Sequence, residues 1–123
     1  MTMPEPLYLK EIPEYIPKVV FNTDEGIFEM RGDVVAASHQ CYDATLGWLK
    51  TYAEAPNKAT TFCFYLGYMS EEGEKLIKDM IGILRTLPDI IIEWQYQEYD
   101  LDLKEYGEDL AEDLNFPFKY VRL

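Results

Sequence analysis

The segment between residues 59 and 96 most narrows the folds open to this chain. It consists of an apolar run, Ala59–Tyr68, an amphipathic stretch, and a second apolar run, Ile90–Tyr96. Apolar residues three and four positions apart predict a helix of about sixteen residues between the runs. A strand, a helix and a strand in this order form a right-handed crossover, so we expect the two strands to pair in parallel. Because Ala59–Tyr68 is apolar on both faces, we expect it mid-sheet and buried on both sides.

Shorter elements surround this unit. We expect strands at Leu7–Ile12, Lys18–Asn22, Ile27–Arg31 and Phe118–Val121, and helices at about Val35–Ala53 and Leu101–Leu114. Gly26 suits a positive φ in the turn after the second strand, and Gly32-Asp33 is expected to end the third. The fold class is therefore α/β (α+β). We expect one domain over residues 1–123, with a mixed five- to six-stranded sheet, about three helices packed on it and a loose tail at residues 1–6.

Acidic residues outnumber basic ones, 23 to 11, which gives a net charge of −12. Nucleic acids and anionic membrane surfaces are bound mainly through Lys and Arg, so we exclude both as partners. No apolar run approaches the roughly 20 residues of a membrane span. The N-terminus lacks the basic and apolar regions of a secretory signal, so we expect a cytoplasmic protein. The densest acidic stretch, residues 93–113, predicts a solvated face or a surface for a basic partner.

Residues typical of catalysis or metal binding are sparse. Cys41 and Cys63 lie far apart among apolar neighbours, and we interpret both as reduced core thiols. The single histidine, His39, lacks a partner for a metal site or a catalytic pair. Asp100 and Asp102 suit Mg²⁺ or Ca²⁺, although the loop lacks the Gly and closing Glu of an EF-hand; the alternative is an acidic helix start. No motif indicates a catalytic residue or a cofactor.

Aromatic residues accompany this acidic pair. Trp94 and Tyr96 occupy alternate strand positions and so share a face. Two interpretations remain open, core packing or a contact surface for a protein partner, which includes a second copy of the chain. We call the candidate surface the aromatic–acidic patch; it comprises Trp94, Tyr96, Tyr99, Asp100 and Asp102.

The turn after the first apolar run combines a hydroxyl with carboxylates. Ser70 is well placed to cap the following helix, and Glu71 and Glu72 suit the positive end of its dipole. A phosphoacceptor here would act as a switch, because a phosphate changes both the cap and the surrounding charge. The alternative is that Ser70 only caps the helix.

Several parts of the sequence resemble the SiaC family of bacterial regulatory phosphoproteins. The resemblance covers almost the whole chain and rests on Pro17–Phe21, Asp24–Gly26, Gly32, Trp48-Leu49 with Tyr52, Phe62–Tyr68, Trp94-Gln95-Tyr96 with the acids after it, Gly107-Glu108-Asp109 and Phe116-Pro117-Phe118. It implies a non-enzymatic protein of a partner-switching circuit, with an architecture like that of anti-sigma-factor antagonists. The implied partners are a kinase, a PP2C-type phosphatase and a diguanylate cyclase, which the unphosphorylated form activates. The family is thereby linked to cyclic-di-GMP signalling and biofilm control.

The chain departs from the family pattern at the turn before the helix. That turn typically reads Tyr-Phe-Asn-Thr-Ser-Ser, with the threonine phosphorylated. Aligned on Tyr68, this chain has Glu71 in the threonine position and Ser70 as a fallback acceptor. A Ser-Tyr-Pro-Glu-type stretch after the third strand is likewise replaced by Val34–Ala37. We interpret Glu71 as a fixed charge that mimics phosphorylation in part, or as the mark of a member that no longer switches. The alternatives are a protein-binding or dimerisation module with no phosphoswitch and, more distantly, an acidic-site metal-dependent enzyme.

Overall fold

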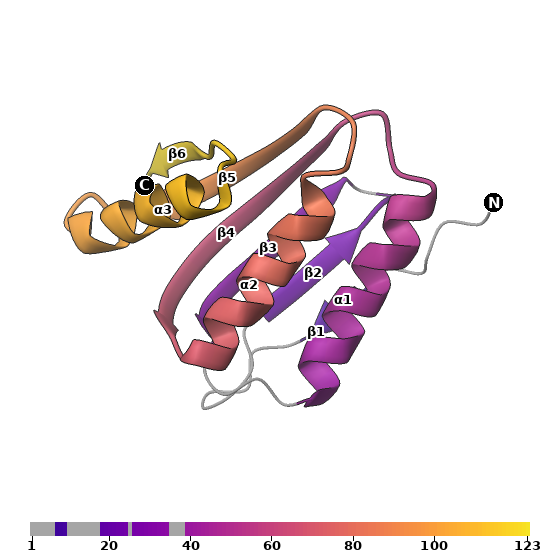
Figure 1. The fold of residues 1–123 in the computed structure, drawn as a ribbon, viewed down its shortest axis with the longest axis horizontal. Helices are drawn as coiled ribbons and strands as arrows, with labels where there is room; N and C mark the ends of the chain where they lie inside the picture. Colours follow the sequence, from indigo (N-terminus) through magenta and orange to yellow (C-terminus); the bar gives the residue numbers. More distant parts are fainter. Residues whose placement is uncertain (1–6, 10–17, 25, 35–38) are drawn as a thin grey trace.

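The computed structural model describes residues 7–9, 18–24, 26–34 and 39–123. Strands and helices follow the predicted order (Figure 1): β1 (Leu7–Leu9), β2 (Lys18–Asn22), β3 (Ile27–Val34), α1 (His39–Glu54), β4 (Thr60–Met69), α2 (Glu71–Leu84), β5 (Ile90–Tyr96), α3 (Leu101–Leu114) and β6 (Lys119–Arg122). The predicted tail at residues 1–6, the end of the first predicted strand and the predicted helix start at residues 35–38 lie outside the described residues.

The six described strands form one mixed sheet in chain order, β1-β2-β3-β4-β5-β6. The first three are antiparallel neighbours, and Gly26, with a φ of 68°, lies in the turn between β2 and β3. The pairs β3–β4, β4–β5 and β5–β6 are parallel. The predicted fold class, the hairpin and the parallel pairing across the crossover are therefore confirmed.

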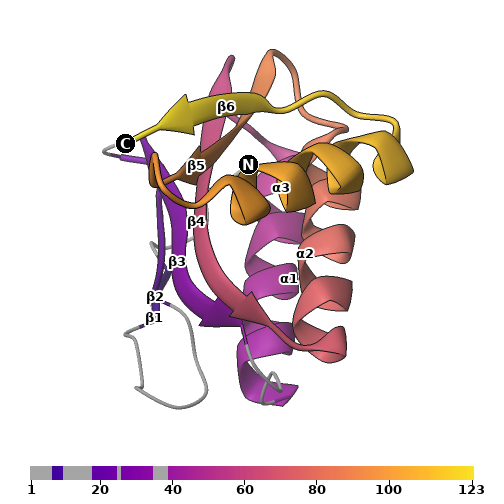
Figure 2. The ribbon, with the colours of Figure 1, turned by 90° about the vertical axis from the view of Figure 1, so that its left-hand side faces the viewer.

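All three helices lie on one face of the sheet. Each joins two neighbouring parallel strands, and the strand order always advances in the same direction. Because such crossovers are right-handed in nearly all proteins, helices that join them fall on the same side. Figure 2 shows α1 and α2 side by side against that face, while the twist of the sheet turns β6 across the direction of β1 to β3. In the part of the chain that the structure describes, no helix is both long and apolar enough to span a membrane.

The core fills the space between this face and the helices, and aromatic rings dominate it. The ring of Phe21 lies 5.1 Å from that of Trp48 and 5.2 Å from that of Phe62, measured between centroids. The predicted helix stripes supply the other wall, with these residues buried: Thr45, Trp48, Leu49 and Tyr52 of α1, and Leu76, Ile77, Met80, Ile81 and Leu84 of α2. Each buried side chain of this size contributes about 1.5–3 kcal/mol, so this layer holds the helices on the sheet.

The second face of the sheet corrects one prediction. The sequence predicts β4 to be buried on both faces, but burial alternates along it. Phe62, Phe64 and Leu66 are buried under the helices, whereas Cys63 and Tyr65 are only half-buried. The prediction is wrong because the described residues place every helix on one side, and apolar side chains can remain partly exposed on the other.

The end of β3 corrects a second prediction, since the strand continues past Gly32. Gly32 has a φ of 105°, and the register with β4 shifts between Gly32 and Val34. The glycine therefore marks a bulge and not a strand end. Beyond it, Asp33 Oδ1 accepts a hydrogen bond of 2.8 Å from the backbone N–H of Tyr68. This extension brings β3 to the turn at which α2 begins.

Candidate functional site

Ser70 holds the turn between β4 and α2. Its Oγ accepts a hydrogen bond of 3.1 Å from the backbone N–H of Gly73, which satisfies a free donor of the first helical turn. Its own N–H donates to the carbonyl oxygen of Val34 at 2.9 Å, and its Oγ lies 3.4 Å from that same oxygen. The predicted helix cap is confirmed, and the hydroxyl is engaged with backbone groups of two elements.

Gly73 lets the first turn of α2 pack directly on the end of β3. A β-carbon at this position would lie 2.0 Å from the carbonyl oxygen of Val34 and 2.9 Å from its Cγ1. No side chain fits in that space without a shift of the backbone. The start of α2 is therefore held against the sheet by close packing as well as by hydrogen bonds.

Three carboxylates, those of Glu71, Glu72 and Glu74, occupy the first turn of α2. The side chains of Glu71 and Glu72 are exposed. Unpaired backbone N–H groups and the helix dipole favour negative charge at this end of a helix. The turn therefore presents fixed negative charge to the solvent from a rigid base.

Two residues of the aromatic–acidic patch belong to the core. Trp94 is 1% exposed and Tyr96 is 7% exposed. The indole of Trp94 stacks on the ring of Phe118 at 5.7 Å, and its Nε1 donates a hydrogen bond of 3.0 Å to the carbonyl oxygen of Leu103. Because α3 covers this part of β5, these two side chains pack in the interior and do not reach a partner.

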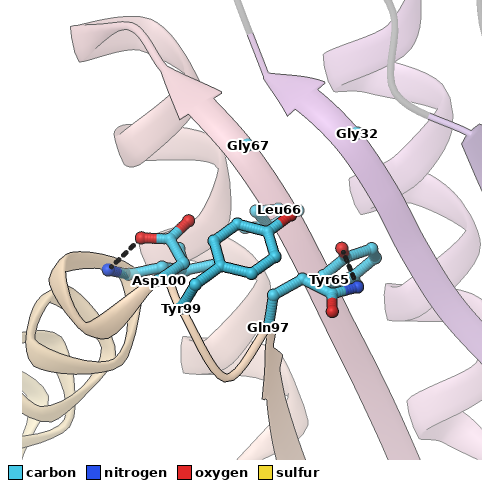
Figure 3. Close-up of a pocket in the computed structure, with 8 residues that line it drawn as sticks. Gly32, Tyr65, Leu66, Gly67, Gln97, Tyr99 and Asp100 are labelled. Atoms are coloured by element: carbon cyan, nitrogen blue, oxygen red, sulfur yellow. Dashed lines mark hydrogen bonds between the residues drawn. The ribbon is translucent and has the colours of Figure 1, made fainter. Parts of the chain in front are cut away.

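The other three patch residues lie along a groove between the end of β4 and the start of α3. Two adjoining hollows of about 220 Å³ and 330 Å³ form it, and Figure 3 shows the first. We call it the β4–α3 groove; its lining residues are Gly32, Tyr65, Leu66, Gly67, Tyr68, Met69, Gln97, Tyr99, Asp100, Asp102, Leu103 and Tyr106.

The two acids of the groove mark the start of α3. Asp100 is the N-cap, and its Oδ1 accepts a hydrogen bond of 3.1 Å from the backbone N–H of Leu103. Asp102 lies in the first turn and is exposed. The acidic helix start that the sequence left open as an alternative is therefore what the structure shows. Within the described residues, no three Asp, Glu, His or Cys side chains lie close enough together to hold a metal ion.

Large apolar side chains are exposed around the groove. Tyr99 is 86% exposed, Tyr68 is 65% exposed and Leu101 is 64% exposed. The sequence singled out Tyr99 but not the other two. Leu101 carried a signal, because it falls outside the inward-facing spacing of Leu103 and Tyr106. Tyr68 carried none, because it continues the alternation of the buried Phe62, Phe64 and Leu66. The register shift between Gly32 and Val34 interrupts that alternation before Tyr68.

Tyr106 forms part of the inner wall of the groove. Burial, followed by the negative charge of Glu74, raises the pKa of the Tyr106 hydroxyl to about 12. The phenol is therefore neutral at physiological pH. The acidic charge that borders the groove comes from its rim and not from its inner wall.

Comparisons with known proteins agree on one family and one fold. Residues 11–123 match the family described as SiaC family regulatory phosphoprotein. A chain of the crystal structure of the diguanylate cyclase SiaD in complex with its activator SiaC, from Pseudomonas aeruginosa, is 18% identical, with a TM-score of 0.83 over 95% of this chain and 99% of that chain. The apo-SiaC crystal structure from Pseudomonas aeruginosa is 18% identical, with a TM-score of 0.81 over 94% of this chain and 98% of that chain. At such identities the likeness shows the fold alone. No curated protein matches the chain.

Proposed function

Because the chain belongs to the SiaC family of regulatory phosphoproteins, we propose that it is a non-enzymatic signalling protein that binds a diguanylate cyclase. The fold it shares with a chain of the SiaD–SiaC complex supports this class of partner. The observation that carries the proposal is the rigid turn between β4 and α2. There Glu71 presents a carboxylate two residues beyond Met69, which lines the β4–α3 groove.

Glu71 acts as a partial and permanent substitute for a phosphorylated residue. A carboxylate carries one negative charge and two oxygens, where a phosphate carries nearly two charges and three oxygens. In the family pattern the unphosphorylated form binds and activates the cyclase. The charge of Glu71 therefore lowers the affinity for the cyclase without abolishing it.

Ser70 is poorly suited to replace the missing threonine. Its Oγ already accepts the N–H of Gly73 and lies 3.4 Å from the carbonyl oxygen of Val34. A phosphate on Ser70 would add about two negative charges beside the three carboxylates of the first turn of α2. Repulsion from these carboxylates and from the Val34 carbonyl opposes the modification.

The first experiment asks whether the chain is phosphorylated. The protein is incubated with ATP and the kinase encoded beside it in the genome, and its intact mass is measured. We expect no shift of roughly 80 Da, the mass of one phosphoryl group, in the natural chain. The Glu71→Thr variant restores the hydroxyl and should gain that shift, whereas Glu72→Thr in the same exposed turn should not. A shift that maps to Ser70 in the natural chain would contradict the fixed-charge role of Glu71.

The second experiment measures binding to the diguanylate cyclase of the same genome by calorimetric titration. Glu71→Thr should bind a few-fold more tightly than the natural chain, because the variant loses the exposed charge that mimics phosphorylation. Glu72→Thr is the control for a loss of charge at the neighbouring position. If none of the three proteins binds the cyclase, the proposed partner class is wrong.

A protein-binding or dimerisation module without a switch is the second candidate. The exposed side chains of Tyr68, Tyr99 and Leu101 favour it, because each is large and apolar and lies in or next to the lining of the β4–α3 groove, where a partner would bury it. Sedimentation over a range of concentrations distinguishes the two candidates. Self-association that Tyr99→Ser abolishes, together with no binding of the cyclase, would support the dimer.

A further inference from the structure

Strand β4 is longer than its pairing with β5. The β4–β5 ladder ends at the pair Phe64↔Trp94, whereas β4 itself runs to Met69. On its other side β4 remains paired with β3 as far as Val34↔Met69. β5 meanwhile continues with β6 as far as Tyr96↔Arg122. Within the described residues, the segment Tyr65–Met69 therefore has a neighbouring strand on the β3 side only.

An unpaired strand edge is chemically specific. Alternate residues of a strand direct their N–H and C=O groups to opposite sides, so such an edge offers a row of donors and acceptors to an incoming strand. Natural proteins usually cover or charge edges that are not meant to pair. The β4–α3 groove runs along this edge, and Figure 3 shows β4 passing the β5–α3 connection with the groove between them.

Residues of the β5–α3 connection and the start of α3 form the wall of the groove opposite β4. Gln97 Nε2 donates a hydrogen bond of 2.9 Å to the hydroxyl of Tyr65, which fixes one end of the groove. Leu103 lines both hollows and provides an apolar wall, and the exposed ring of Tyr99 lies at the rim. The groove thus combines a free backbone edge, an apolar wall and an exposed aromatic ring.

The charge of the groove lining indicates the charge of the segment that would bind there. Among the described residues that line the groove, the charged ones are Asp100 and Asp102, and both are acidic. A basic segment is attracted to this rim, whereas an acidic one is repelled.

We propose that the β4 edge receives an extended, basic segment of the partner protein as an added strand. This inference rests on the proposed function, since it describes how a protein partner is bound. Main-chain hydrogen bonds to those groups of Tyr65–Met69 that face away from β3 supply affinity; the N–H of Tyr68, which Asp33 already binds, is not among them. Alternate side chains of the segment enter the groove, and Lys or Arg side chains meet the acidic rim.

The test uses the full chain labelled with ¹⁵N and a synthetic probe, a blocked peptide of about ten residues that alternates Val and Lys. Backbone amide spectra are recorded during the titration. We expect shifts confined to Tyr65–Met69 and to residues 97–103. The probe N-methylated at its two central residues keeps its charge but loses an N–H on each edge, and it should bind at least about fivefold more weakly. A peptide that alternates Val and Glu should not bind.

Two acids of α3 provide a matched pair of variants. Asp102→Asn removes a charge from the groove, and Asp109→Asn removes the same charge two turns further along the helix, where it does not line the groove. The first should weaken binding of the Val–Lys probe about two- to threefold, and the second should leave it unchanged. Equal effects of the two variants would indicate general attraction to an acidic protein.

Three results would overturn the added-strand proposal. They are shifts spread over the acidic faces of α2 and α3, equal binding of the N-methylated probe, and no binding of any probe. A probe that becomes helical on binding, seen by circular dichroism, would instead identify a helix-binding groove. The peptide titration contains no cyclase, so a negative titration does not contradict the proposed partner class. Conversely, failure of the cyclase to bind does not contradict a positive titration.

Discussion

Gly107 of α3 lies directly against the indole ring of Trp94. A β-carbon at Gly107 would be 2.5 Å from both Cδ1 and Nε1 of the indole. Tyr106 stacks on the same ring at 6.2 Å, so α3 is seated on β5 through this side chain. The position of α3 sets the position of one wall of the β4–α3 groove, and the contact between Gly107 and Trp94 therefore shapes the candidate binding site from beneath.

Gly107→Ala should destabilise the protein. Alanine is favoured over glycine inside a helix by about 1 kcal/mol, but the overlap with a buried ring costs about 1–3 kcal/mol. We expect the overlap cost to lie near the upper end of that range because the ring of Trp94 is rigid and buried, which leaves a net loss of about 2 kcal/mol. Gly47→Ala in α1 is the control. A β-carbon at Gly47 meets nothing within 4 Å, so this substitution should stabilise the protein. Urea unfolding followed by circular dichroism measures both, and equal stability of the two variants would contradict the contact.

Gly73→Ala should displace the start of α2 as well as destabilise the fold. Its β-carbon would overlap the backbone carbonyl of Val34, which cannot move without shifting β3. We expect a loss of about 2–3 kcal/mol and a weaker interaction of the Ser70 turn with β3. Gly82→Ala near the other end of the same helix meets nothing within 4 Å and serves as the control. Unfolding in urea and amide exchange at Ser70 report the two effects, and a stable variant with protected Ser70 would disprove the close packing.

The sequence predicted the elements of the fold well because each carries a local signal. The buried residues of α2 follow the three- and four-residue spacing, and Ser70 has the hydroxyl that a helix cap needs. Such signals depend on neighbours in the chain. They were sufficient for the order of elements, for the parallel crossover and for the caps.

The faces of the sheet could not be predicted in the same way. Alternation shows that Trp94 and Tyr96 share a face, but not whether a helix covers it. That depends on the strand order, which places all three crossovers on one side. The sequence therefore did not show whether these two side chains lie in the core or on the surface. It also did not predict that the second face of β4 is half-exposed. The β4–α3 groove arises from the divergence of β4 and β5, for which the chain carries no local signal.

Ser70→Ala should remove about 1 kcal/mol from the free energy of unfolding, since Gly73 N–H loses the acceptor that caps α2. Ser70→Asn keeps a good capping side chain and should restore most of that stability. The measurement is the urea midpoint of each variant at one pH. A Ser70→Ala variant as stable as the natural protein would mean that the cap contributes nothing.

Cys63 and Glu93 face each other across the open side of the sheet. They are register partners in β4 and β5, and Cys63 Sγ lies 3.6 Å from Glu93 Oε1. Burial, followed by the charge of this carboxylate, raises the pKa of the Cys63 thiol from 9.0 to about 11. The thiolate form is therefore suppressed although the side chain is only half-buried.

Alkylation by iodoacetamide at pH 8 should therefore be slow at Cys63. A shift from 9.0 to about 11 reduces the thiolate fraction about a hundredfold, and the rate should rise with pH until about 11. Glu93→Gln removes the nearby charge and should speed the reaction. Folding stability should fall between pH 9 and 11, because the thiol of the unfolded chain releases its proton first, and Cys63→Ser should flatten that fall. Peptide mapping reads Cys63 separately from Cys41, and a Cys63 rate equal to that of a free thiol would contradict the raised pKa.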